Sequence, residues 1–172
     1  MLDTGGVLIL HHLPSTSSKK WGVNTLVGMA LSSNNSRGPK YPIYNTSISL
    51  VRHFSQISRL NLGVAYEQNH LVAEVGLHST QFSTAREARL ASERWMGFLE
   101  QEALFGRVAM VIQSGIYLRK FEGVRNLWYN KFGLRVYMPP IGCPKTQFHV
   151  GFCVKAHLAT AEYIAFTGGA SF

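Results

Sequence analysis

The chain has 172 residues, a length that corresponds to one domain. Its hydrophobic residues make up 46%, which excludes a disordered chain, and its longest early apolar run, Val7–Leu10, is too short for a membrane-spanning helix. The 17 basic and 9 acidic residues give a net charge of +8, which favours a polyanionic partner, and because the basic residues are dispersed and no nucleic-acid-binding motif is present, we expect no nucleic-acid partner.

The N-terminal segment Met1–Leu13 has an apolar centre but neither a basic leading region nor a small-residue cleavage site. It is therefore not a convincing signal peptide, and the sequence leaves open whether export is absent or the export segment is trimmed. We expect residues 1–20 to form an N-terminal extension and residues 21–172 to form a single domain.

From Ile43 onward apolar residues occur mostly at every second position, which predicts strands. An even number of strands, joined early in the chain by alternately short and long connections, is typical of an antiparallel up-and-down β-barrel. The eight expected strands are Trp21–Ser32, Tyr44–Phe54, Arg59–Asn69, Glu93–Leu104, Arg107–Lys120, Leu127–Met138, Phe148–Ala159 and Glu162–Phe172.

Both termini of such a barrel lie at one end, so the connections divide into two groups. Turns at the end that carries the termini are expected at Ser55–Ser58, Phe105–Gly106 and Pro139–Gln147. Loops at the opposite, outer end are expected at Ser33–Ile43, His70–Ser92, Phe121–Asn126 and Thr160–Ala161. Short inner turns and longer outer loops are the asymmetry of bacterial outer-membrane barrels.

The fourth expected strand, Glu93–Leu104, is preceded by a helix signal. Thr84 is a suitable N-cap with Glu87 three residues later, which predicts a short helix over 84–92. If Thr84–Glu102 were one helix, only seven strands would remain and the simple barrel would fail.

The seventh expected strand has the clearest division into two faces. Val150, Phe152 and Val154 share one face, and His149 and Lys155 share the other. A water-soluble barrel turns its apolar face inward and a transmembrane barrel turns it outward, and alternation by itself fits both. Cys143 and Cys153 predict no disulfide, because ten residues of extended chain would separate them by about 33 Å.

Two further features favour the transmembrane barrel. The last expected strand ends on the aromatic Phe172, as the assembly signal of outer-membrane barrels does. The expected strands are about eleven residues long, which matches the nine to eleven tilted residues that cross a bilayer. A soluble, lipocalin-like binding barrel is the remaining alternative.

Several segments together resemble a known family. They are Leu104–Arg107, Gly115–Leu118, Tyr129–Tyr137, Val150–His157 and Ala161–Ile164, followed by the terminal Phe172. The sequence resembles the lipid A 3-O-deacylases, and most of all their acyloxyacyl hydrolase branch from Bacteroidetes-type bacteria. The resemblance implies an eight-stranded barrel in the bacterial outer membrane, inserted by the barrel-assembly machinery, that hydrolyses an ester-linked acyl chain of lipid A in lipopolysaccharide.

The family uses a Ser nucleophile, a His base and an acidic residue, and such a triad needs no metal or cofactor. The resemblance assigns the base to His157, but Ala159 stands two residues later, where the family has its serine. The nearest hydroxyl is Thr160, which strand alternation would turn to the opposite face from His157 unless the turn redirects it. Glu162 is the nearest carboxylate, closer in sequence than the family acid.

The missing serine supports a second interpretation, a non-catalytic barrel of the same fold. In that case the lumenal charges would form a stabilising network in a narrow barrel. The residues expected in it are Glu67, Glu100, Glu102, Lys131, Arg135 and Lys155.

Basic residues in the outer loops fit contacts with the phosphates of lipid A. Solvated loop charges are the alternative interpretation. The candidates are Arg37, Lys40, Arg119, Lys120 and Arg125.

Overall fold

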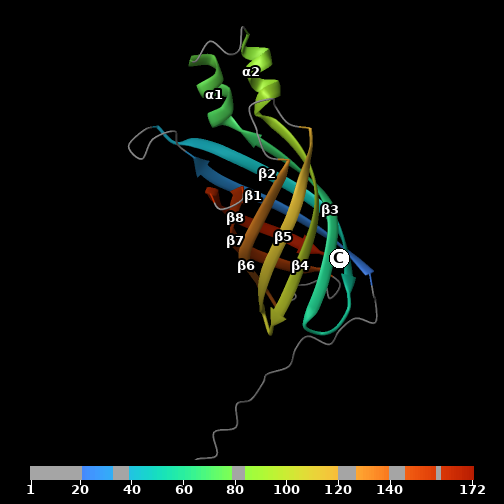
Figure 1. Ribbon diagram of the computed structural model, residues 1–172. Helices are drawn as coiled ribbons and strands as arrows, with labels where there is room; N and C mark the ends of the chain where they lie inside the picture. Colours follow the sequence, from blue (N-terminus) through green and yellow to red (C-terminus); the bar gives the residue numbers. More distant parts are fainter. Residues whose placement is uncertain (1–20, 33–38, 79–83, 120–126, 140–145, 158–159) are drawn as a thin grey trace, which may run out of the picture.

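The computed structural model describes residues 21–32, 39–78, 84–119, 127–139, 146–157 and 160–172. Strands of these residues form one closed antiparallel barrel in which each strand pairs with its neighbours in the chain and β1 pairs with β8 (Figure 1). The strands are β1 (Trp21–Ser32), β2 (Tyr41–His53), β3 (Ser58–Asn69), β4 (Glu93–Phe105), β5 (Val108–Arg119), β6 (Trp128–Tyr137), β7 (Gln147–His157) and β8 (Thr160–Ser171). The predicted eight-stranded up-and-down barrel is confirmed.

Two helices, α1 (His70–His78) and α2 (Ala85–Ser92), stand at one end of the barrel, between β3 and β4 (Figure 1). The C-terminus lies toward the opposite end. Because strands alternate in direction, the end of β7 and the start of β8 lie at the same end as the helices. We call this the helix-bearing end.

Helix α2 begins as its cap predicts: the hydroxyl of Thr84 accepts a hydrogen bond from the backbone N–H of Glu87 at 3.3 Å. It ends at Ser92 because Glu93 takes an extended backbone conformation, so residues 84–102 are not one helix. Helix α1 was expected only as loop, although the Asn69 side chain accepts a hydrogen bond from Leu71 N–H at 3.1 Å and caps it. Neither described helix is long and apolar enough to cross a membrane.

The connection between β7 and β8 lies two residues earlier in the chain than predicted. Thr160 was expected in the turn, but it is the first residue of β8, and its Cα pairs with that of His157. Thr160 belongs to the strand because it pairs with His157 of β7, and the apolar–polar alternation within one strand does not show pairing between strands. The remaining strand ends differ from the predicted ones by a few residues.

The barrel wall is apolar on its outside. Large hydrophobic side chains on every strand are exposed, for example Val27, Ile48, Leu62, Leu99, Ile112, Phe132, Phe152 and Phe166. Polar and charged side chains fill the lumen, among them Asn24, Asn45, Asn61, Glu67, Arg94, Glu100, Gln113, Lys131, Arg135, His149 and Lys155. A water-soluble lipocalin-like barrel has the inverse arrangement, so the structure removes the physical basis of that alternative.

The lumenal half nearer the termini is held by an ion-pair network centred on Arg135. Its guanidinium bonds to the carboxylates of Glu100 and Glu102, and the hydroxyl of Tyr137 donates to Glu102 at 2.6 Å. Lys131 differs from the prediction: among the described residues it has no carboxylate within ion-pair distance, and its Nζ lies 5.7 Å from the centroid of the Tyr129 ring. The network otherwise forms as the sequence predicts.

Candidate active site

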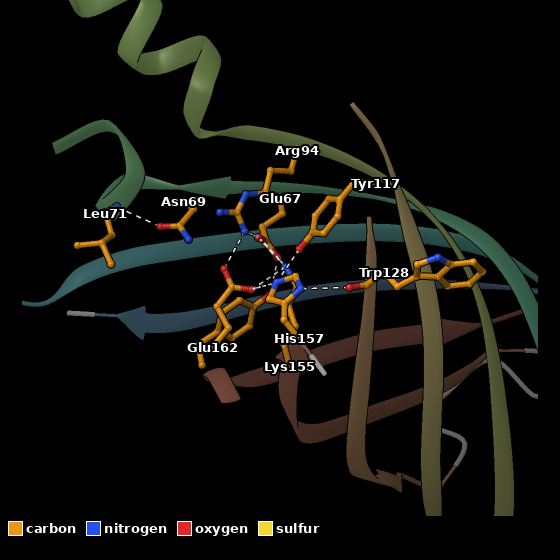
Figure 2. Close-up of polar contacts among 10 residues, drawn as sticks. Glu67, Asn69, Leu71, Arg94, Tyr117, Trp128, Lys155, His157 and Glu162 are labelled. Atoms are coloured by element: carbon orange, nitrogen blue, oxygen red, sulfur yellow. Dashed lines mark hydrogen bonds and ion pairs between the residues drawn. The ribbon is translucent and has the colours of Figure 1, made fainter. Parts of the chain in front are cut away.

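A second polar cluster lies in the lumen at the helix-bearing end, where five strands meet. It is drawn from the end of β3, the start of β4, the end of β5, the end of β7 and the start of β8. Figure 2 shows these side chains pointing toward one another beneath the helices. We call them the mouth cluster: Glu67, Arg94, Tyr117, Lys155, His157, Glu162 and Tyr163.

His157 and Glu162 are in direct contact. The Nε2 atom of His157 lies 2.9 Å from Oε2 of Glu162, and each side chain is 19% exposed, so both remain accessible from the mouth. The other ring nitrogen, Nδ1, lies 3.2 Å from the backbone carbonyl oxygen of Trp128. Because a carbonyl oxygen only accepts, Nδ1 carries a hydrogen and donates it there. The Trp128 carbonyl thereby fixes the orientation of the imidazole, and Glu162 accepts a hydrogen bond from Nε2 when that nitrogen is protonated.

A β-bulge explains why Glu162 reaches His157. In the β7–β8 register Lys155 pairs with Tyr163 and Ala156 pairs with Ala161, which leaves Glu162 as an extra residue. Strict alternation would direct Glu162 and Tyr163 to opposite faces, whereas both contact the mouth cluster. Bulges redirect a side chain in this way and are frequent beside active sites.

Two cations hold the Glu162 carboxylate. Arg94 Nη1 lies 2.7 Å from its Oε1, and Lys155 Nζ lies 3.2 Å from its Oε2. The same two cations bind the fully buried carboxylate of Glu67, with Lys155 Nζ 2.7 Å and Arg94 Nη1 3.1 Å from its oxygens. Tyr163 also donates to Glu67. Two carboxylates and two cations cancel in formal charge, so the cluster is neutral when His157 is neutral.

The hydroxyl closest to this imidazole among the described contacts belongs to Tyr117. Its Oη lies 3.1 Å from His157 Nε2, and the two rings stack with centroids 5.7 Å apart and an interplanar angle of 22°. Thr160, the hydroxyl expected from the sequence, is the register partner of His157 across the hairpin. Ala159 lies outside the described residues.

Of the expected phosphate contacts, Lys40 and Arg119 are described and both are exposed at the helix-bearing end. No contact joins either of them to the mouth cluster within the described part of the chain. Arg37, Lys120 and Arg125 lie outside the described residues, as does Cys143. The thiol of Cys153 is free.

Sequence reasoning missed Arg94 and Tyr117 as parts of this site. Tyr117 had a detectable signal, because it occurs on the polar face of its strand. Arg94 is the second residue of β4, where the helix signal of the preceding segment obscured strand alternation. Within the described ranges no group of three or more His, Cys, Asp and Glu side chains could hold a metal ion.

The comparisons with known proteins agree with this architecture. A family model described as acyloxyacyl hydrolase, C-terminal domain, matches residues 19–172. No curated protein and no solved structure matches the chain.

Proposed function

This chain belongs to the acyloxyacyl hydrolase family, and from that premise we propose that it is a bacterial outer-membrane barrel that hydrolyses an ester-linked acyl chain of lipid A. The observation that carries the proposal is the contact between His157 Nε2 and Glu162 Oε2, 2.9 Å apart and accessible from the helix-bearing end. A histidine whose protonated form is stabilised by a carboxylate is a suitable general base for ester hydrolysis.

Location in the outer membrane is supported by the wall of the barrel. Between two sets of exposed aromatic residues, most of the outward side chains are apolar, as in membrane-spanning barrels. Tyr44, Trp95 and Trp128 lie toward the helix-bearing end, and Trp21, Phe54, Phe105, Phe148 and Phe172 toward the other. The outer end then lies at the level of lipid A headgroups, and insertion by the barrel-assembly machinery is part of the proposal.

A charge on the outer wall tests this location. Ile112 is 44% exposed near the middle of β5, and we expect Ile112→Lys to lower the free energy of unfolding of the bilayer-inserted barrel by about 2–4 kcal/mol, because the ammonium must enter hydrocarbon. Gln56→Lys, which adds the same charge in the exposed inner turn, is the control. Urea titration of the bilayer-inserted barrel measures both, and equal stabilities for the two variants contradict the location.

We assign His157 as general base and Glu162 as the carboxylate that stabilises His157 once Nε2 is protonated. His157 takes a proton from the attacking hydroxyl, whose oxygen bonds to the ester carbon. It then returns that proton to the leaving sugar oxygen as the carbon–oxygen ester bond breaks. While it holds the proton, the mouth cluster changes from neutral to +1, which stabilises the negative charge on the substrate oxygen.

We assign the attacking hydroxyl to Thr160. What supports this choice is the backbone register, since the Cα atoms of Thr160 and His157 are partners across the hairpin. The acyl chain would pass to the threonine oxygen, and a water activated by the same His157 would release it as a fatty acid. The hairpin would then supply nucleophile and base from its two strands.

Loss of this hydroxyl gives a direct prediction. We expect Thr160→Ala to lower fatty-acid release from purified lipid A in detergent at least about a hundredfold, because no acyl-enzyme can form. Thr167→Ala, farther along β8, is the matched control and keeps its activity. If Thr160→Ala stays active while His157→Ala does not, water attacks directly and the assignment of Thr160 is wrong.

Recognition of lipid A is assigned to the outer basic residues. Lys40 and Arg119 are exposed at the helix-bearing end, which supports contacts with anionic headgroups. Arg37, Lys120 and Arg125 are assigned the same role from the sequence. Charge reversal at Lys40 or Arg119 should therefore raise the KM for lipopolysaccharide.

A second candidate is a non-catalytic barrel of the same fold. It is favoured by Ala159 at the family's serine position and by the neutral mouth cluster, whose paired charges would serve only to fill the lumen. This candidate predicts that the purified barrel releases no fatty acid from lipid A under any condition.

A further inference from the structure

The Nε2 atom of His157 has two neighbours, one that only accepts a hydrogen bond and one that can also donate. Glu162 Oε2, at 2.9 Å, is a carboxylate oxygen that accepts, whereas the hydroxyl of Tyr117, at 3.1 Å, also has a hydrogen to donate. Nδ1 is already committed to the Trp128 carbonyl. The protonation state of Nε2 therefore decides which neighbour it bonds.

When Nε2 is unprotonated, its lone pair accepts the Tyr117 hydrogen. When Nε2 gains a proton, it donates that proton to Glu162, and the Tyr117 hydrogen is released to another acceptor. The same nitrogen is the base in the proposed reaction, so this release coincides with the step in which negative charge develops on the substrate.

We propose that Tyr117 is a catalytic residue whose hydroxyl donates a hydrogen bond to the oxyanion of the tetrahedral intermediate, and that protonation of His157 frees it to do so. This inference rests on the function proposed above. It extends that function by assigning the group that stabilises the transition state.

The surroundings of Tyr117 hold its hydroxyl in place. Tyr117 is 4% exposed, and two cations lie near its ring, with Arg94 Cζ 5.8 Å and Lys155 Nζ 5.2 Å from the ring centroid. The Tyr129 ring packs 5.4 Å away, centroid to centroid. A donor fixed before the reaction, with positive charge beside it, is what stabilises an oxyanion most effectively.

Among the described contacts, the hydroxyls of the other lumenal tyrosines do not bond to His157. Tyr137 and Tyr163 donate to the carboxylates of Glu102 and Glu67, which keep their hydrogens occupied. Tyr129 accepts from the side chain of Gln113 at 2.9 Å. Among the described tyrosines, only Tyr117 contacts an atom that gains and loses a proton in the proposed reaction.

One proton passes to His157 and back while the tetrahedral intermediate forms and collapses. The attacking hydroxyl gives its proton to Nε2, its oxygen bonds to the ester carbon, and the carbonyl π electrons move to the carbonyl oxygen, which accepts the Tyr117 hydrogen. As the intermediate collapses, the electrons return, the bond to the sugar oxygen breaks, and that oxygen takes the proton from Nε2. Tyr117 then donates to Nε2 again.

The test is Tyr117→Phe, which removes one oxygen and keeps the ring. With lipid A in detergent we expect kcat to fall about a hundredfold or more with KM nearly unchanged, because the lost bond forms only in the transition state. Tyr129→Phe, the same change in the adjacent ring, should retain its kcat. Heat-dependent mobility on a denaturing gel establishes that both variants are folded.

The outcomes separate the two proposals. An active wild type that loses activity in His157→Ala but keeps it in Tyr117→Phe overturns the role of Tyr117 alone. An inactive wild type overturns the proposed function and this inference together. If Tyr117→Phe does not fold, nuclear magnetic resonance of the ¹⁵N-histidine-labelled wild type decides: an alkylphosphonate, which mimics the oxyanion, should shift the His157 Nε2 resonance to that of a protonated nitrogen, and an unshifted resonance refutes the inference.

Discussion

Replacing His157 with alanine is expected to lower kcat for lipid A deacylation by about a hundredfold to ten-thousandfold, because the proposed reaction loses its general base. The side chain is 19% exposed, its ion partner Glu162 is still held by Arg94 and Lys155, and folding should therefore be retained. Fatty-acid release from purified lipid A, measured with the folded barrel in detergent, gives the rate.

His53→Ala is the control for this variant. His53 ends β2 at the opposite end of the barrel, so its loss should leave kcat unchanged. If His157→Ala retains the wild-type rate, His157 is not the base, and the second candidate function or a different site takes its place.

Replacing Glu67 with glutamine is expected to have the largest effect on stability. Glu67 is fully buried and binds Arg94 and Lys155, so its loss leaves buried positive charge without its main partner. Breaking a buried ion pair from one side costs about 3–5 kcal/mol. Activity should fall as well, since these two cations also hold Glu162.

Glu93→Gln is the matched control for this substitution. Oε1 of Glu93 lies 4.0 Å from Nε of Arg89, whose side chain is 76% exposed. An exposed ion pair contributes about 1 kcal/mol or less to stability. Urea titration of the two variants in bilayers compares them. Equal free energies of unfolding would mean that the mouth cluster does not stabilise the barrel.

Strand order and face assignment were predictable because alternation is a local property. Val150, Phe152 and Val154 share the outer face as the pattern predicts, and His149 and Lys155 share the lumen. The pattern does not reveal which face is inside, since a soluble and a membrane barrel alternate alike. Strand length and the terminal aromatic residue supplied that choice.

The helices were only half predictable for a comparable reason. Thr84 and Glu87 form a cap with a recognisable spacing, and α2 begins there. Helix α1 is apolar and its cap is Asn69, which also completes the alternation of β3, so strand and helix signals overlap at one residue.

The mouth cluster could be predicted only in part because it depends on pairing between strands. His157 was found through the family resemblance and Glu162 as the nearest carboxylate, but their contact requires the bulge at Glu162, and a bulge leaves no mark on alternation in one strand. Thr160 was expected on the opposite face by counting along the chain, whereas the hairpin register makes it the partner of His157. Tyr117 and Arg94 come from other strands that only the closed barrel brings near.

Removal of an acyl chain from lipid A in the outer membrane, as proposed for this barrel, changes the mass of the lipid. Mass spectrometry of lipid A from cells with and without the protein detects that change. We predict that lipid A from cells with the protein includes a species lighter by one ester-linked fatty acid, and that this species is absent without the protein. Identical lipid A spectra from the two strains, with the barrel folded in the outer membrane, would contradict the proposed function.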